Sequence, residues 1–292
     1  YAFRGRYAIM VGFPNPKTGK PTQIIGYQNM DELADILAPY VFECRKDEVM
    51  DLPPKVFERR YLQLTPEQRA LYKQIKKEST YSVGDTEVVV QNTLELALRL
   101  QQVAGGFISY LKKEMMDGPR GEKVKKTTIW EAVIMPHNNP KIKEVLEIAA
   151  LGKPTIFWCA YKLEIATVAA ALREAYPGEM VCEIHGGVDD EGRELSKAMF
   201  QTGKCRFLVG NTATGGTGLT LTAAEIMVYY NNTERMIDRE QSEDRAHRYG
   251  LQHSVLYIDL IMEKTVDETI IASIEGKMDL AEYIRQNIRR AS

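Results

Sequence analysis

The chain has 292 residues, with 38 Lys and Arg against 40 Asp and Glu, so its formal net charge at pH 7 is −2. This balance excludes a basic chain overall but allows a local basic face. The 44% apolar and 27% charged residues are typical of a globular protein. The length corresponds to about two domains at roughly 100–200 residues each. No apolar run approaches the ~20 residues that a membrane span needs.

The cysteines lack the close spacing of a zinc site. They are Cys44, Cys159, Cys182 and Cys205. We expect free thiols, buried in a protein of a reducing compartment. The N-terminus shows neither an initiator Met nor a signal peptide. We therefore expect a segment of a longer, intracellular protein.

The first part of the chain predicts irregular structure over residues 1–29 and a short helix over 31–37. A strand over 56–64 then leads into a helix that begins at Thr65. The sequence Thr65-Pro66-Glu67-Gln68 supplies a capping hydroxyl, a proline in the first turn and a reciprocal capping amide. A further helix over 93–104 ends at two glycines.

Residues 112–126 hold six Lys or Arg against three Asp or Glu, together with Gly118, Pro119 and Gly121. This composition predicts an exposed connector, and we place a domain boundary near residue 127.

After residue 139 strands and helices alternate. Strands are expected over 154–160, 180–184, 205–209, 226–230 and 255–261. Helices are expected over 140–150, 163–175, 191–201, 234–248 and 266–276. This alternation predicts an α/β fold with a parallel sheet and helices on both faces.

A phosphate-binding loop of the Walker type is not found. Gly19-Lys20 is preceded by Pro14 where the loop needs glycine, and Pro21 takes the place of the hydroxyl residue. Proline also removes a backbone donor from a loop that must offer N–H groups to phosphate. No Asp-Glu pair follows an expected buried strand, so a magnesium-holding carboxylate of the Walker B kind is not found either.

The segment Gln241 to Gly250 is the strongest local signal. On a helix, Gln241, Arg245 and Arg248 are spaced four and three residues apart and share one face. Two guanidinium groups and an amide on one stripe could hold a polyphosphate. The alternative is a solvated helix in which Asp244 pairs with Arg248.

Two loops follow expected strands at the edge where parallel sheets bind ligands. The first, Thr212 to Leu221, is rich in glycine and hydroxyl residues; the alternative is a flexible turn. The second is His185-Gly186-Gly187, whose histidine could instead serve only as a structural hydrogen-bonding group.

In this order the motifs resemble the second RecA-like lobe of superfamily-two helicases, in particular the SWI/SNF-type double-stranded DNA translocases. Ile156 to Tyr161 resembles motif IV, Thr212 to Leu221 motif V, and Gln241 to Gly250 motif VI, "Q-x-x-x-R-x-H-R-x-G". His185-Gly186-Gly187 with Arg193 and Phe200 resembles the family's "HGx…R…F" segment. Upstream, three segments resemble the family's region between the lobes: Leu52 to Lys55, Leu64 to Tyr72 and Leu100 to Gly105.

The resemblance implies a RecA-like lobe over 127–292. It implies that 1–126 form a mainly helical inter-lobe or protrusion region and the end of lobe one. Leu251 stands where the family usually has Gln, and Asn231-Asn232-Thr233 where many members have Trp-Asn-Pro. These departures indicate a divergent branch, bacterial or phage, and favour a cytoplasmic over a nuclear location.

The resemblance also implies roles for individual residues. Arg245 and Arg248 would be the catalytic arginine fingers. Gln241, Gly216 and Gly218 would serve the ATP site. Contacts to the DNA backbone would come from Lys162, His185, Gly186 and Thr212.

The implied cofactors are ATP and Mg²⁺, bound mainly by lobe one. The implied partners are double-stranded DNA, recognised without regard to sequence, and the N-terminal helicase lobe on the same chain; no membrane is involved. The leading hypothesis is the C-terminal half of an ATP-dependent DNA translocase or helicase. It would be inactive as an ATPase alone, because the Walker A and Asp-Glu motifs are missing.

Two other functions remain open. The first is a non-catalytic module that binds nucleic acid or protein on a RecA-like scaffold. The second is a Rossmann-type dinucleotide or methyl-donor enzyme, which the missing Gly-x-Gly-x-x-Gly after a first strand disfavours.

Overall fold

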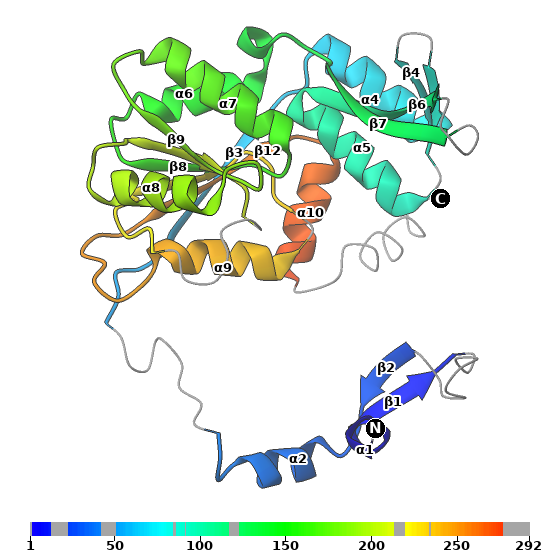
Figure 1. The fold of residues 1–292 in the computed structure, drawn as a ribbon, viewed down its shortest axis with the longest axis vertical. Coiled ribbons are helices and arrows are strands. Elements are labelled where there is room, and N and C mark those ends of the chain that lie inside the picture. Colours follow the sequence, from blue (N-terminus) through cyan, green and yellow to red (C-terminus); the bar gives the residue numbers. More distant parts are fainter. Residues whose placement is uncertain are drawn as a thin grey trace. The chain divides into compact units, whose positions relative to one another are not determined.

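The computed structural model describes residues 2–12, 23–41, 51–83, 86–90, 92–116, 123–212, 220–233 and 235–276. The chain divides into two compact units, Tyr1–Asp51 and Leu52–Ser292. Each unit is described by itself, and Figure 1 shows the elements of both.

The first unit contains α1 (Ala2–Tyr7), β1 (Ala8–Val11), β2 (Gln23–Tyr27) and α2 (Met30–Leu37). Helix α2 confirms the short helix expected at 31–37. The expectation of irregular structure over 1–29 is wrong at helix α1 and where β1 and β2 pair as an antiparallel hairpin. The glycines and prolines of this region fall mostly between the two strands, and each strand is too short to show a clear alternating pattern.

The second unit contains a six-stranded sheet in the order β3-β12-β11-β8-β10-β9. All neighbouring strands are parallel. The strands are β3 (Val56–Leu62), β8 (Thr155–Trp158), β9 (Val181–Ile184), β10 (Phe207–Gly210), β11 (Ile226–Tyr229) and β12 (Leu256–Met262). The expected α/β fold with a parallel sheet is confirmed.

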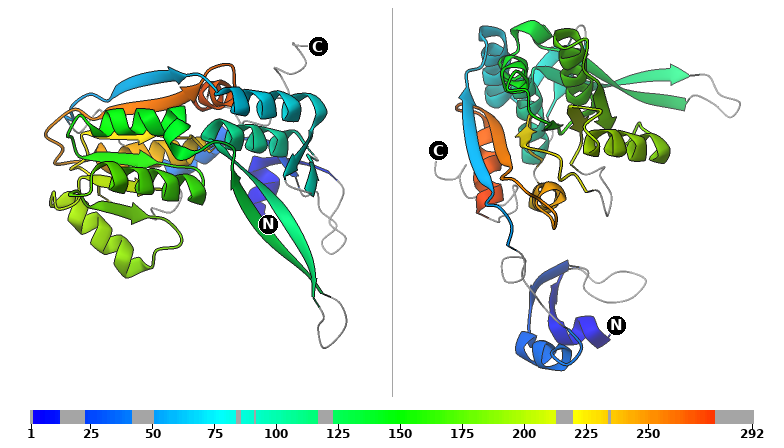
Figure 2. Two further views of the ribbon diagram at one scale, coloured as in Figure 1. Left: turned by 90° about the horizontal axis from the view of Figure 1, so that it is seen from above. Right: turned by 90° about the vertical axis from the view of Figure 1, so that its left-hand side faces the viewer.

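Helices cover both faces of this sheet (Figures 1 and 2). On one face Phe157 and Val228 pack against α6 (Pro140–Ala149) and α7 (Lys162–Ala175). On the other, Ile156 and Trp158 pack with α8 (Asp190–Gln201) and α9 (Met236–Ala246). Successive residues of a strand point to opposite faces, so strands covered on both sides are apolar throughout. This explains why the sequence located β8, β10 and β11 as nearly continuous apolar runs, whereas β9 carries Glu183 and β12 carries Asp259.

Helices α4 (Pro66–Glu78), α5 (Thr93–Gly105) and α10 (Val266–Glu275) share a separate apolar core. The capping box at Thr65 is confirmed: its hydroxyl accepts from the Gln68 N–H, and the Gln68 side chain accepts from the Thr65 N–H. The buried Gln68 amide also donates to the carbonyls of Val103 and Ala104. One side chain therefore caps α4 and joins it to α5.

Two hairpins depart from the sequence expectations. Strands β4 (Thr80–Val83) and β5 (Thr86–Val89) pair, as do β6 (Phe107–Met116) and β7 (Lys123–Ala132). The β6–β7 hairpin extends away from the sheet in Figure 2. The expected connector over 112–126 is therefore largely strand. The charge and glycine content of 112–126 favoured a connector, and the β-forming residues at 127–130 that follow it were not recognised as part of a strand.

The sheet also takes its edge strand, β3, from the part of the chain before residue 127. The segment before that residue thus holds strands as well as helices, and the boundary near 127 remains a prediction.

Gly210, the last residue of β10, lies where three strand ends approach closely. A Cβ added to it would lie 2.6 Å from the Ile184 carbonyl oxygen and 3.3 Å from Trp158 Cζ3. Neither a backbone oxygen nor a fully buried indole can move away easily. A side chain at this position would therefore force the surrounding backbone to shift.

We predict that Gly210→Ala lowers the free energy of unfolding by about 1–3 kcal/mol, the usual cost of overpacking. Urea denaturation measures this loss. Gly178→Ala is the matched control, because a Cβ there meets no heavy atom within 4 Å. Equal stability of the two variants would contradict the close approach at Gly210.

Candidate functional site

The carboxyl ends of β8, β9 and β10 are tied together by Asn211. Its backbone N–H donates to the Ile184 carbonyl at 3.1 Å. Its side-chain Nδ2 donates to the carbonyls of Cys159 and Ala160 at 3.2 and 2.9 Å. Because the strands are parallel, the loops that follow them meet at one edge of the sheet. Most of the candidate residues from the sequence lie on or beside this edge.

Arg245 lies near the end of α9 and is 6% exposed. Its Nη2 donates to the Thr212 carbonyl at 3.0 Å, and its guanidinium carbon lies 5.4 Å from the centre of the Trp158 ring. Burial lowers the pKa of Arg245 from its ordinary value, although an arginine remains charged near neutral pH. The structure thus holds a desolvated positive charge beside the loop that follows β10.

Three buried polar atoms near this position have no hydrogen-bond partner among the residues that the structure describes. They are Arg245 Nη1, Thr212 Oγ1 and Trp158 Nε1. Most buried polar groups in proteins are paired, because an unpaired one costs about 1–3 kcal/mol. This concentration of unpaired groups marks the Arg245 region as a candidate ligand site.

The other motif VI candidates lie differently. Gln241 is exposed, while Arg248 is half-buried. Helix α9 ends at Ala246, so the expectation of a helix through Arg248 is wrong by two residues, and the three side chains do not share one helical stripe.

The Arg248 side chain is held by two neighbours. Its Nε donates to the backbone carbonyl of Asp244 at 3.0 Å, and its Nη1 lies 3.5 Å from Thr220 Oγ1. The Asp244 carboxylate lies 3.6 Å from Lys55 Nζ. Arg248 therefore sits in the turn after α9, beside the end of the loop that carries motif V.

The candidates for nucleic-acid contact are spread along the carboxyl edge. Lys162 is exposed at the first position of α7, and Gly186 is exposed. His185 Nδ1 accepts from the Gly187 N–H at 3.0 Å, and its Nε2 lies 3.4 Å from Glu183. The structural alternative for His185, a hydrogen-bonding role, is therefore compatible with its contacts. Thr212 is buried. Gly216 and Gly218 lie outside the described residues.

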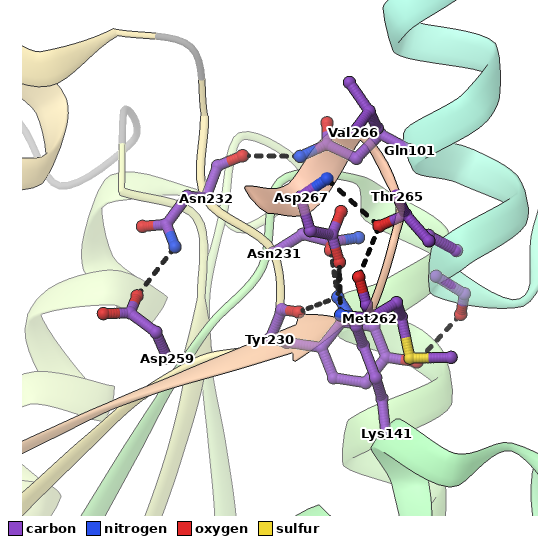
Figure 3. A network of polar contacts seen from close by, with 12 residues as sticks. Gln101, Lys141, Tyr230, Asn231, Asn232, Asp259, Met262, Thr265, Val266 and Asp267 are labelled. Atoms are coloured by element: carbon purple, nitrogen blue, oxygen red, sulfur yellow. Dashed lines mark hydrogen bonds and ion pairs between the residues drawn. The ribbon is translucent and has the colours of Figure 1, made fainter. Parts of the chain in front are cut away.

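A buried polar network lies beneath this edge (Figure 3). Its centre is Lys141 of α6, whose side chain is fully buried. Nζ lies 2.8 Å from Asp267 Oδ2, 2.8 Å from the Tyr230 carbonyl and 2.5 Å from Asn231 Oδ1. The ammonium group thereby joins α6 to the β11 exit and to the start of α10.

Asn231 extends the network to the β8 exit. Its amide Nδ2 donates to Glu164 Oε1, and Glu164 Oε2 accepts from the N–H groups of Ala160 and Tyr161 at 3.0 and 3.1 Å. Burial raises the pKa of Glu164 to about 7, while the charge of Lys141 acts in the opposite direction.

Asn232 turns the other way, toward α9. Its Nδ2 donates to Asp259 Oδ1 at 2.7 Å, and its Oδ1 accepts from Arg239 Nη1 at 2.7 Å. Arg239 also pairs with Asp259 and lies over the Tyr229 ring, 3.4 Å from its centre. The bidentate contact and the aromatic ring fix α9 on the sheet.

Sequence reasoning missed this network. Asn231-Asn232-Thr233 stands out there as a departure from a family pattern, and Lys141, Glu164 and Asp267 fall within expected helices with no pattern that marks them. One signal could have pointed to them: Asn231 and Asn232 directly follow a fully apolar strand, where buried amides need several partners.

Cys159, Cys182 and Cys205 are free and buried, as expected; Cys44 lies outside the described residues. The described part of the chain contains no group of three or more His, Cys, Asp or Glu that could hold a metal ion. Within the same ranges, no helix combines the length and apolar character that a membrane crossing needs.

We predict that Glu164 makes stability depend on pH. Its pKa rises from an ordinary 4.5 to about 7 on folding. Between these values the folded state therefore binds more protons than the unfolded one, so this contribution to stability is lost as pH rises. From pH 5 to pH 8, the free energy of unfolding should fall by about 1–3 kcal/mol relative to Glu164→Gln. Urea denaturation across this range measures the difference, and parallel pH profiles for the two proteins would contradict it.

Two family models match the sequence. The SNF2-related domain matches residues 16–105, and the helicase conserved C-terminal domain matches residues 140–250. The second match contains Lys162, His185, Arg245 and Arg248.

Curated relatives agree with these matches. YwqA of Bacillus subtilis (strain 168), named as an ATP-dependent helicase/translocase, is 25% identical over 89% of this chain and 27% of its own length. The TATA-binding protein-associated factor MOT1 of Saccharomyces cerevisiae is 23% identical over 99% of this chain and 18% of its own length. The chain thus spans less than a third of either relative.

Solved structures share the fold. The C-terminal part of the Fun30 ATPase domain matches with a TM-score of 0.54 at 14% identity, covering 76% of this chain and 89% of that one. The Sulfolobus solfataricus SWI2/SNF2 ATPase core in complex with double-stranded DNA matches with a TM-score of 0.53 at 20% identity, covering 85% and 50%. The two family matches, together with the curated relatives, place the chain in the SNF2-related family, with a helicase conserved C-terminal domain over residues 140–250.

Proposed function

We propose that the chain is the C-terminal half of an ATP-dependent DNA translocase. ATP and Mg²⁺ would bind mainly to an N-terminal lobe on the same polypeptide. The C-terminal lobe would close over the nucleotide with the carboxyl edge of its sheet. The observation that carries the proposal is the buried guanidinium of Arg245. One of its nitrogens is held by the Thr212 carbonyl, while Nη1 has no partner among the described residues.

Arg245 and Arg248 would act on the transferring phosphoryl group. An arginine is permanently charged and donates several hydrogen bonds in one plane, which suits the oxygens of a phosphate. Charge in a desolvated site stabilises a transition state more strongly than charge in water. Arginine fingers contribute on the order of 10³–10⁵ in rate to nucleotidases. Gln241, exposed on α9, would contact the γ-phosphate, and Gly216 and Gly218 would also serve the ATP site.

DNA would lie along the loops at the carboxyl edge, where Lys162, His185 and Gly186 are exposed or half-buried. A lysine, a ring nitrogen and backbone N–H groups suit phosphate oxygens, which carry no sequence information. Thr212 is a weaker candidate for DNA contact, because it is buried and its carbonyl accepts from Arg245.

We propose that residues 1–126 supply the end of lobe one and the inter-lobe region, and that 127–292 form the C-terminal lobe. The match of residues 16–105 to the SNF2-related domain supports the first assignment, and the match of 140–250 to the helicase conserved C-terminal domain supports the second. A cytoplasmic location in a bacterial or phage-infected cell also remains part of this proposal.

We predict that the 292-residue chain alone does not hydrolyse ATP, whereas the full-length protein does so with Mg²⁺ and duplex DNA. In the full-length protein, Arg245→Ala and Arg248→Ala should each lower kcat by about 10³-fold or more. Arg245→Lys should not restore activity, because an ammonium group cannot copy the planar donor geometry. Phosphate release at saturating DNA measures these rates.

The control is Arg173→Ala, which removes a surface arginine that pairs with Glu183 and should leave kcat within about 2-fold. Hydrolysis by the isolated chain that disappears in Arg245→Ala would overturn the half-enzyme proposal. Intact DNA-stimulated hydrolysis in full-length Arg248→Ala would favour the non-catalytic binding module.

Lys162 provides the test of DNA contact. We predict that Lys162→Ala weakens duplex binding by the full-length protein about equally for different sequences. The slope of log affinity against log salt should fall by about 1, as expected for one lost phosphate contact. Fluorescence anisotropy at several salt concentrations measures both quantities.

Lys153→Ala is the matched control, because Lys153 is also an exposed lysine but precedes β8 at the amino edge. If both variants change the salt slope equally, DNA does not lie along the carboxyl edge.

A further inference from the structure

Asn231 and Asn232 are consecutive residues on the segment that joins β11 to α9, and both are buried, at 2% and 7% exposure. Surface loops seldom bury two adjacent amides, because each carries donors and acceptors that must be paired. Here the two side chains serve different parts of the lobe. Figure 3 shows Asn231 beside Tyr230 and Lys141, and Asn232 bonded to Asp259.

Asn231 holds the loop that precedes Lys162. Its amide bonds Glu164, and Glu164 in turn accepts the two backbone N–H groups of Ala160 and Tyr161. One buried carboxylate therefore holds the two N–H groups of this loop, while Asn211 holds the carbonyls of Cys159 and Ala160. On its other side, Asn231 Oδ1 accepts from Lys141, so rotation of the amide would break both contacts at once.

Asn232 holds the helix that carries Arg245. It bonds both members of the Arg239–Asp259 pair, and Arg239 lies less than two turns before Arg245 on α9. Ser242, between them, bonds the Tyr229 hydroxyl at 2.7 Å. The buried face of α9 is thus fixed through Asn232 and the end of β11.

Gln101 of α5 connects the Asn232 segment directly to the loop before Lys162. Its Nε2 donates to the Asn232 carbonyl at 2.7 Å, and its Oε1 accepts from the Tyr161 hydroxyl at 3.0 Å. Tyr161 also packs edge-on against Phe107 at the base of the β6–β7 hairpin. The loop before Lys162, α5 and α9 therefore meet through one pair of asparagines.

We propose that Asn231 and Asn232 are positioning residues that couple the arginine helix α9 to the loop that carries Lys162. A shift of α9 on nucleotide binding would displace Asn232, and the adjacent Asn231 would then move Glu164 and the N–H groups that it holds. Buried polar networks suit this role because their members exchange partners in discrete steps. The inference rests on the proposed function, since it concerns how the arginines on the nucleotide side are coupled to Lys162 on the DNA side.

The experiment uses full-length protein with Asn231→Ala, Asn232→Ala and the smaller change Asn232→Ser. Asn139→Ala is the matched control: Asn139 is equally buried and bonds the Gly105 carbonyl and the Tyr230 hydroxyl, but it is bonded to neither α9 nor the Lys162 loop. The main readout is the ratio of kcat at saturating DNA to kcat without DNA, measured with KM for DNA. Thermal unfolding is recorded for each variant.

We expect the asparagine variants to lower this ratio at least 10-fold and Asn139→Ala to leave it within 2-fold at a similar loss of Tm. An unchanged ratio in the asparagine variants, despite a lower Tm, would show that Asn231 and Asn232 only stabilise the fold. That result would overturn the coupling. A wild-type protein without DNA-stimulated hydrolysis would instead overturn the proposed function and the inference that rests on it.

A second measurement needs no catalysis. Hydrogen exchange at Ala160 and Tyr161 should quicken at least 10-fold in Asn232→Ala and Asn232→Ser, although the Asn232 side chain bonds neither residue. Unchanged exchange there would show that the two asparagines act independently and would overturn the coupling.

Discussion

The carboxyl edge depends on the burial of one charge. Lys141 is fully enclosed, and an ammonium group without water is tolerated only when its protons are accepted by well-placed oxygens. Three acceptors surround it, from Asp267, Asn231 and the Tyr230 carbonyl. These belong to α10 and to the segment after β11, so the requirement to satisfy one cation fixes the relative positions of three elements.

The partners that a buried charge needs are distant in the sequence, whereas strands and caps are encoded locally. The sequence therefore predicts the sheet better than it predicts the site. Short continuous apolar runs such as Ile156–Trp158, bounded by turn residues, are typical of strands covered on both faces, and the capping box at Thr65 depends only on local residues. Lys141 and Asp267 are 126 residues apart, and no local pattern marks them as partners. The β6–β7 hairpin was missed for a related reason, since cross-strand pairing compensates for a composition that is typical of a linker.

The resemblance to motif VI located Arg245 and Arg248 but did not predict where their helix ends. It selected Arg245 and Arg248 together, and a regular helix would have presented both on one stripe. In the structure α9 ends at Ala246. The backbone N–H groups of His247 and Arg248 bond the carbonyls of Glu243 and Ala246, and the chain turns away. Helix termini are set by capping and tertiary contacts, which a motif does not encode.

This difference in setting assigns the two arginines different physical roles within the proposed function. Arg245 is desolvated, oriented by the Thr212 carbonyl and packed near Trp158, so it is preorganised and loses little conformational entropy when it meets a phosphate. Arg248 is half-buried in a turn and is held by the Asp244 carbonyl and, at 3.5 Å, by Thr220. Within the proposed function, this looser hold would let Arg248 change partners. A fixed arginine beside an adjustable one suits a cleft that must recognise a nucleotide in the same place while the lobes open and close.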